Sequence, residues 1–298
     1  LASRIGSGYV GGNNFSWGAN PGDGYGTALA IEGNRLALGA PFGDTGGPNT
    51  GAVLLFSFAD ANFAAPVLES IITAGSFTAK PINLSGTLEA GDLFGSAVSL
   101  DGNRLAVGAF GDDGATNSCP SCGAVYLFTF TDSVFSGGTL ASRIGSGYTG
   151  GNNINLASTL GLLDRFGFAV SLDGNRLAVG AYGDGGATNS CPDCGAVYLF
   201  TFTDSVFSGG TLAARIGNGY TGGNDINLIG TLGVSDQFGY AVSLDGSRLA
   251  VGAVFDDGAT NSCQNCGAVY LFTFADTSFS GGTLAARLGD YLVNDQHV

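Results

Sequence analysis

Lysine, histidine, methionine and tryptophan are almost absent from this chain of 298 residues. Lys80 is the only lysine, His297 is the only histidine, and methionine is missing even from position 1. The ten lysine and arginine residues are outnumbered by 24 acidic residues, which leaves a net charge of −14. Phosphate binding requires clustered basic side chains, so no nucleic-acid partner is expected. The missing initial methionine indicates a processed mature form or a fragment, with any secretion signal already removed.

Long apolar runs and proline are scarce as well. No apolar run reaches the roughly 18 residues that a membrane-spanning helix needs, so no membrane span is expected. Proline occurs 7 times beside 53 glycines, and the glycines have no three-residue period, which excludes a collagen. With 44% hydrophobic residues the chain is too apolar to be disordered. Many tight turns between short strands explain this composition, and no amphipathic helix is evident.

Catalytic motifs are also missing. A Ser-His-Asp or Cys-His arrangement would depend on His297 in the tail. The chain has no Gly-x-Ser-x-Gly, P-loop or HExxH motif. We therefore expect a protein that is not an enzyme.

The sequence consists of one unit written four times. The segment FGSAVSLDGNRLAVGA begins at Phe94, close copies begin at Phe166 and Phe238, and a divergent copy begins at Tyr25. The intervals from 94 to 166 and from 166 to 238 are both 72 residues. A second segment, GAVYLFTF or GAVLLFSF, begins at Gly51, Gly123, Gly195 and Gly267. A third segment, of the LASRIG type, occurs five times and begins at Leu1, Leu68, Leu140, Leu212 and Leu284.

Each unit predicts four short strands. In the second unit these are Ala97–Leu100, Arg104–Gly108, Gly123–Phe130 and the LASRIG segment, and Asp101-Gly102 is a hairpin turn signal. Alternate residues of GAVYLFTF give two apolar faces, as expected for a sheet packed between two others.

The chain is therefore predicted to be all-β: a β-propeller-type repeat protein of four blades, each of about 72 residues and four antiparallel strands. A β-solenoid is the rival, although 72 residues is long for one coil. Residues 1–298 are interpreted as a single repeat domain. Its units lie at about 1–67, 68–139, 140–211 and 212–283, followed by a terminal strand and tail at 284–298.

The segments FG, AVSLDGNRLAVGA, GDDG and GAVYLF, in this order, resemble the FG-GAP repeats of integrin alpha-subunit propellers. They are closer still to the versions in bacterial secreted and surface proteins. The resemblance covers residues 25 to about 289. It implies one propeller blade per repeat, an extracellular or cell-surface location in a bacterium, and a role in adhesion or protein recognition. It is more specific for the fold than for the function.

Two features depart from the integrin pattern. Integrin blades that bind calcium carry a DxDxDG loop, whereas this chain has only Leu-Asp-Gly-Asn at Leu100–Asn103. One carboxylate cannot supply the roughly six to eight oxygens that calcium takes, so that site is not carried over. Integrin propellers also have seven blades, and four repeats are visible here.

The six cysteines form three CxxC pairs, each just before a GAVYLF strand. The pairs are Cys119 and Cys122, Cys191 and Cys194, and Cys263 and Cys266. We predict a local disulfide in each, formed in an oxidising compartment. A zinc site that joins pairs from two units and a thioredoxin-like redox centre are the alternatives.

Aspartates recur in two sets. The loop after the second strand carries Asp112, Asp113, Asp184, Asp256 and Asp257, with Asp44 as the counterpart in the first unit. Two residues before each aromatic-Gly pair stand Asp23, Asp92, Asp164 and Asp236. Loops after strands two and four open on the same face of a blade, so the sets are expected to approach each other. They either hold a cation such as calcium, or another ligand, or stabilise glycine-rich turns. No metal ligand is assigned. Two sets of recurring arginines are expected to pair with these aspartates: Arg35, Arg104, Arg176 and Arg248 after the hairpin turn, and Arg4, Arg143, Arg215 and Arg287 in the LASRIG segments.

Two functions are consistent with these features. The first is a secreted structural protein that assembles with copies of itself into a filament or surface layer. Its surface has little charge, lysine is not available to protect strand edges, and five LASRIG segments exceed the four that four blades need. One terminal strand would then insert into a neighbouring copy. The second is an adhesin or lectin that recognises a glycan or host protein through the GYTGGNN-type loops at Tyr9, Tyr148 and Tyr220.

Overall fold

The computed structural model describes residues 3–16, 18, 20–75, 81–259 and 263–289. Lys80, His297 and the tail from residue 290 lie outside these ranges, as do the first two residues of the N-terminal LASRIG segment. Every regular element in the described part is a β-strand, so the all-β prediction is confirmed. Accordingly, no membrane-spanning helix is found among the described residues.

The strands form four large sheets, one after another along the chain. Sheet 1 contains β3 (Ala28–Glu32), β4 (Arg35–Ala40), β5 (Ala52–Ser57), β6 (Val67–Thr73) and β7 (Pro81–Asn83). Sheet 2 contains β8 (Ala97–Asp101), β9 (Arg104–Ala109), β10 (Ala124–Thr129), β11 (Thr139–Gly145) and β12 (Ile154–Asn155). Sheet 3 contains β13 (Ala169–Asp173), β14 (Arg176–Ala181), β15 (Ala196–Thr201), β16 (Thr211–Gly217) and β17 (Ile226–Asn227). Sheet 4 contains β18 (Phe238–Asp245), β19 (Arg248–Ala253), β20 (Ala268–Thr273) and β21 (Thr283–Leu288). A separate pair consists of β1 (Ile5–Gly6) and β2 (Phe15–Ser16).

The strand number per unit differs from the prediction. The first four strands of each sheet are antiparallel neighbours, as predicted, but sheets 1 to 3 each have a fifth strand that runs parallel to the fourth. In sheet 2 this pairing joins Ile144 to Ile154. The fifth strand of sheets 2 and 3 is two residues long and lies in the glycine-rich and asparagine-rich segment, so it carries no alternating pattern. The sheets also extend beyond the limits of the predicted units, because the cut at residue 68 falls within β6.

The alternation in the third strand places its two sets of side chains in two different cores. Val125 and Leu127 lie between sheets 2 and 3, whereas Tyr126 and Phe128 lie between sheets 1 and 2. We call the face that packs on the next sheet the forward face and the opposite face the rear face. The prediction that each sheet is packed on both sides is correct for sheets 2 and 3.

The FG and GA residues of neighbouring units are joined by backbone bridges. Gly123 bridges Phe166, and Gly51 and Gly195 bridge Phe94 and Phe238 in the same way. A Cβ atom on Gly123 would lie 2.0 Å from the carbonyl oxygen of Phe166, and the φ angle of this glycine is +85°. Only glycine both adopts this positive φ angle without strain and leaves room for the oxygen of Phe166. The motif therefore holds each sheet against the next.

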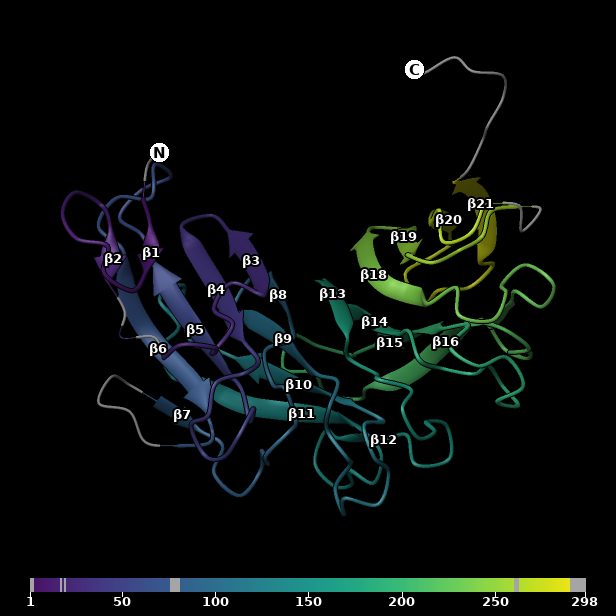
Figure 1. Ribbon diagram of the computed structural model, residues 1–298, viewed down its shortest axis with the longest axis horizontal. Helices are drawn as coiled ribbons and strands as arrows, with labels where there is room; N and C mark the ends of the chain where they lie inside the picture. The colour runs from purple at the N-terminus through teal and green to yellow at the C-terminus, as the bar shows by residue number, and fades with distance from the viewer. Residues whose placement is uncertain (1–2, 17, 19, 76–80, 260–262, 290–298) are drawn as a thin grey trace.

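The four sheets form an open arc rather than a closed ring (Figure 1). Sheet 1, in purple and blue, lies at one end, and sheet 4, in light green and yellow, lies at the other. The arrangement is propeller-like, with large sheets stacked face to face around a common centre. The first and last sheets consequently each have a face that no full sheet covers.

Candidate functional site

A buried aspartate binds two tyrosines in sheet 2. Asp112, in the loop after β9, accepts a hydrogen bond from the Tyr126 hydroxyl at 2.7 Å and from the Tyr148 hydroxyl at 2.8 Å. The backbone N–H of Gly114 donates a third at 2.7 Å. Arg143 lies over the Tyr148 ring at 4.4 Å. Burial raises the pKa of Asp112, and the hydrogen bonds from both tyrosines oppose this rise.

Sheet 3 repeats the cluster. Asp184 accepts hydrogen bonds from the hydroxyls of Tyr198 and Tyr220, the latter at 2.8 Å, and Arg215 lies over the Tyr220 ring at 4.5 Å. A second aspartate stands beside each cluster. Burial, and then repulsion by Asp184, raises the pKa of Asp164 to about 7. The two carboxylate sets therefore do lie close enough to interact.

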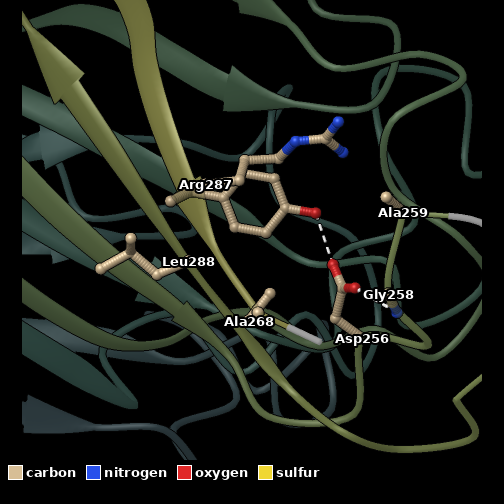
Figure 2. Close-up of a pocket in the computed structure, with 8 residues that line it drawn as sticks. Asp256, Gly258, Ala259, Ala268, Arg287 and Leu288 are labelled. Carbon is tan, nitrogen blue, oxygen red and sulfur yellow. Dashed lines mark hydrogen bonds between the residues drawn. The ribbon is translucent and has the colours of Figure 1, made fainter. Parts of the chain in front are cut away.

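Sheet 4 contains the aspartate and the strand tyrosine of the cluster, and the segment after its fourth strand lies outside the described residues from residue 290. Asp256 accepts hydrogen bonds from Tyr270 and from the N–H of Gly258, but no other tyrosine hydroxyl reaches it among the described residues. A cavity of about 440 Å³ lies beside Asp256 and is lined by these three residues and by Ala259, Ala268, Arg287, Leu288 and Gly289. Figure 2 shows Asp256 at one side of the cavity and Leu288 at the other.

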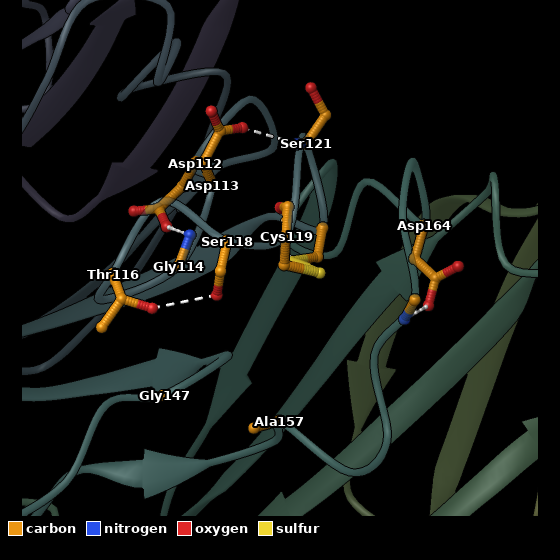
Figure 3. The surroundings of a disulfide bond; sticks show 12 residues. Asp112, Asp113, Gly114, Thr116, Ser118, Cys119, Ser121, Gly147, Ala157 and Asp164 are labelled. Carbon is orange, nitrogen blue, oxygen red and sulfur yellow. Dashed lines mark hydrogen bonds between the residues drawn. A yellow bond between two sulfur atoms is a disulfide. The ribbon is translucent and has the colours of Figure 1, made fainter.

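The remaining aspartates stabilise turns. Asp113 accepts a hydrogen bond from the N–H of Ser121 at 2.6 Å (Figure 3), and Asp257 accepts one from Asn265 at 2.7 Å. The aspartates before each aromatic-Gly pair accept a backbone N–H three residues earlier: Glu89 to Asp92, Gly161 to Asp164 and Gly233 to Asp236. Within the described ranges, no three His, Cys, Asp or Glu side chains converge as a set of metal ligands.

Each CxxC pair is a disulfide in the structure. The bonds join Cys119 to Cys122, Cys191 to Cys194 and Cys263 to Cys266, each with Cα atoms 5.6 Å apart. A Cα separation of this size is usual for a disulfide. Figure 3 shows the first in the loop that also holds Asp112 and Asp113.

The hairpin arginines do not bind the loop aspartates, contrary to expectation. Arg104 forms a salt bridge with Asp101 in its own hairpin, and Arg176 does the same with Asp173. The hairpin turn at Asp101-Gly102 places the side chains of Arg104 and Asp101 beside each other, three residues apart. Arg104 therefore pairs with the aspartate of its own turn and not with a loop aspartate. Arg143 and Arg215 of the LASRIG strands are the arginines that face the buried clusters.

The tyrosines of the clusters were missed or misassigned from the sequence. Tyr148 and Tyr220, expected as exposed loop contacts, are each only 3% exposed. A signal exists: sheet 1 has Gly43, Leu54 and Ile71 at the positions of the cluster's aspartate, strand tyrosine and arginine. Gly43 takes the place of Asp112, since the N–H of Gly51 donates to its carbonyl as that of Gly123 does to Asp112. Leu54 replaces the strand tyrosine, and Asp44 bonds Asn49 as Asp113 bonds Ser121.

The forward face of sheet 4 is open. Val269 is 38% exposed and Leu288 is 58% exposed, whereas their counterparts in sheet 3, Val197 and Ile216, are fully buried beneath sheet 4. The residues that form an internal core between the other sheets therefore face outward at this end.

The rear face of sheet 1 is half covered by the β1–β2 pair. Phe15 packs edge-on against Phe56 with ring centroids 5.3 Å apart. Leu29 and Ile31 on β3 stay 61% and 57% exposed. The pair corresponds to the fourth and fifth strands of a sheet, because β1 is parallel to β2 as β11 is to β12. Tyr9, in the loop between them, is 41% exposed.

A family model of the FG-GAP repeat matches the chain at residues 88–128, 157–200 and 233–272. Each match reaches from before the first strand into the third strand of sheets 2, 3 and 4. A comparison with curated proteins finds no significant match.

Proposed function

This chain is a member of the FG-GAP repeat family, and we propose that it is a non-enzymatic extracellular structural protein, of bacterial origin, that associates head to tail into a filament or surface layer with exchange of a terminal β-strand. The disulfides support the extracellular location, because such bonds persist in oxidising compartments.

The open forward face of sheet 4 is the observation that carries this proposal. The same residue types are buried in all three cores between neighbouring sheets. In each core the forward face of one sheet is covered by the rear face of the next, so the repeat itself indicates what would cover the forward face of sheet 4. On this chain, one rear face is incompletely covered, at Leu29 and Ile31. Burial of one exposed Val or Leu side chain contributes about 1.5–3 kcal/mol. A second copy can therefore continue the stack.

Sedimentation velocity of the full chain over a range of concentrations, with negative-stain electron microscopy, tests the proposal. We expect growing species in the wild type and monomers in Val269→Asp, which places a charge on the forward face of sheet 4. Val206→Asp is the matched control, because Val206 is also exposed, at 49%, but lies in the loop after β15 of sheet 3. It should assemble like the wild type. A wild type that stays monomeric, or a Val269→Asp variant that assembles equally well, would contradict the proposal.

Recognition of a glycan or another protein is the second candidate, and one row of aromatic rings favours it. Phe168 packs against Tyr182 at 4.5 Å and against Tyr240 at 4.7 Å, and Arg165 lies over Tyr182 at 4.9 Å. Tyr240 is 40% exposed. If this row binds a glycan, the monomeric Val269→Asp variant should bind on a glycan array, and addition of Tyr240→Ala should abolish that binding.

A further inference from the structure

We propose that the loop closed by the Cys263–Cys266 disulfide binds residues 22–25 of a second copy through backbone hydrogen bonds. This inference rests on the proposed head-to-tail association and identifies the main-chain contact that would join two copies. We call residues 263–267 the edge loop and residues 22–25 the docking segment.

Within the chain, neighbouring sheets are joined by one recurring backbone contact. Between sheets 2 and 3, three consecutive loop carbonyls accept N–H groups of the next unit: Pro120 from Leu163 at 3.0 Å, Ser121 from Arg165 at 3.1 Å and Cys122 from Phe166 at 2.9 Å. The other two joints repeat it, with the carbonyls of residues 48–50 and 192–194 as acceptors. Main-chain atoms make these bonds, so the contact tolerates different side chains in the loop.

The edge loop has the conformation of the loops that make these joints. Asn265 has a φ angle of +56°, and Ser121 and Asp193, at the matching positions, have +47° and +51°. Asp257 accepts the N–H of Asn265 at 2.7 Å, as Asp113 accepts that of Ser121 at 2.6 Å. The edge loop therefore presents the carbonyls of residues 264–266 as the inner loops present theirs.

The edge loop is exposed where the inner loops are covered. Cys122 and Cys194 are fully buried, whereas Cys266 is exposed. Residues 290–298, outside the described part, correspond by position in the repeat to residues 146–154 and 218–226. Both of those stretches are described, and none of their backbone N–H groups bonds to the carbonyls of residues 120–122 or 192–194. The partner of such a loop is therefore the segment before a Phe-Gly pair, not the stretch that follows the fourth strand.

The docking segment has the conformation of the segments that bind the inner loops. Gly22 and Gly24 have φ angles of +97° and +71°, and the matching residues of sheet 2, Gly91 and Leu93, have +90° and +57°. The Asp23 carboxylate accepts an N–H three residues earlier at 3.0 Å, as the aspartate before each inner Phe-Gly pair does. Sheet 1 thus carries a preformed counterpart of the segment that each inner loop binds.

A glycine that makes room for the next sheet is also present in sheet 4. A Cβ atom on Gly108 or Gly180 would lie 1.8 or 1.9 Å from a backbone oxygen of the next sheet. At the matching Gly252, the nearest atom among the described residues would lie 3.4 Å away, and the φ angle is not positive. Neither its own backbone nor a described neighbour requires glycine at this position. The close approach of a further sheet, supplied by a second copy, does require it.

Sedimentation velocity of the full-length Cys263→Ser/Cys266→Ser variant tests the contact. Without the disulfide the edge loop must be ordered when a second copy binds, so association should weaken about tenfold. Cys191→Ser/Cys194→Ser is the matched control, because its loop already binds sheet 4 of the same chain. The control should melt at a lower temperature and associate like the wild type.

Hydrogen exchange locates the contact, by comparison of wild-type assemblies with the monomeric Val269→Asp variant. The amides of residues 22 and 24 should exchange more slowly in the assembly, because they then donate to the edge loop. The amides of residues 91–94 should exchange slowly in both, since Gly91, Leu93 and Phe94 bind a loop of their own chain.

Two results would overturn the edge-loop contact and leave the head-to-tail proposal standing. One is association that is unchanged in Cys263→Ser/Cys266→Ser, and the other is exchange at residues 22 and 24 that stays fast in the assembly. A wild type that never associates would overturn both proposals.

Discussion

A rise in pH from about 5 to about 8 should destabilise the folded chain, and Asp92 is the residue with which to test this. Burial, and then repulsion by Asp112, raises its pKa from 3.8 to about 7 in the folded state. At pH 5 the folded chain therefore holds a proton that the unfolded chain has released. Because the folded state binds more protons between about pH 4 and 7, the free energy of unfolding falls as pH rises through this window.

The size of the effect follows from the pKa shift. A rise from 3.8 to about 7 corresponds to about 4 kcal/mol, at about 1.36 kcal/mol for each pKa unit. Above pH 5 only about two of these pKa units remain to be lost, or about 2.7 kcal/mol. Water reaches part of the carboxyl group and screens the repulsion, so between pH 5 and 8 we expect about half of this, roughly 1.4 kcal/mol. For a chain of this size that is a fall of about 3 °C in melting temperature.

Thermal unfolding of three proteins at pH 5, 6.5 and 8 measures it. Asp92→Asn keeps an oxygen to accept the N–H of Glu89 but carries no charge, so its melting temperature should vary less with pH. Asp204→Asn is the control, because hydrogen bonds from Ser208 lower the pKa of Asp204, away from this window. A wild-type melting temperature that stays constant or increases from pH 5 to pH 8 would refute the reasoning, as would an Asp92→Asn variant with the wild-type slope.

Three further predictions concern the packing of the sheets. Asp184→Ala leaves the hydroxyls of Tyr198 and Tyr220 without their acceptor and should cost about 3 kcal/mol in urea unfolding. Gly180→Ala should unfold the chain, because its Cβ would lie 1.9 Å from the backbone oxygen of Gly239 in the next sheet. Gly252→Ala is the equivalent change in sheet 4, where the nearest atom to the added Cβ lies 3.4 Å away, so this variant should melt normally. It should nevertheless fail to associate in sedimentation, because a sheet of a second copy would meet the added Cβ. Reduction of the disulfides should lower stability by about 2 kcal/mol for each four-residue loop, measured as melting temperature with and without reductant.

The parts of the fold that could be predicted are those fixed by local pattern. Alternation in GAVYLFTF assigns Val125 to one face and Tyr126 to the other whatever the neighbouring sheets are, because side chains alternate along any strand. The fifth strand could not be predicted in the same way. Ile154–Asn155 is too short to show alternation, and it is a strand only because β11 lies beside it.

The candidate site was harder to predict because its members are distant in sequence. Tyr148 is 36 residues from Asp112, and a tyrosine in a glycine-rich loop suggests an exposed contact until that partner is known. The repeat still contains the necessary clue. Unit 1 has Gly43 and Leu54 where units 2 to 4 have Asp and Tyr, so these residues are lost together. Joint loss within one chain indicates contact, and it predicts the cluster without a structure.

The difference between the two faces of a sheet sets the form of any assembly. In sheets 2 to 4 the forward face presents Val and Leu and the rear face Tyr and Phe, whereas the rear face of sheet 1 presents Leu and Phe. Each core between neighbouring sheets joins a forward face to a rear face, so we expect the same contact between copies. Such a contact is heterologous, and each copy that joins leaves one free end of each kind. Addition of copies then continues as a filament, unless the curvature of the arc in Figure 1 lets several copies close into a ring. The association should therefore produce fibres or rings of several copies, and a dimer that does not grow would require a contact other than this one.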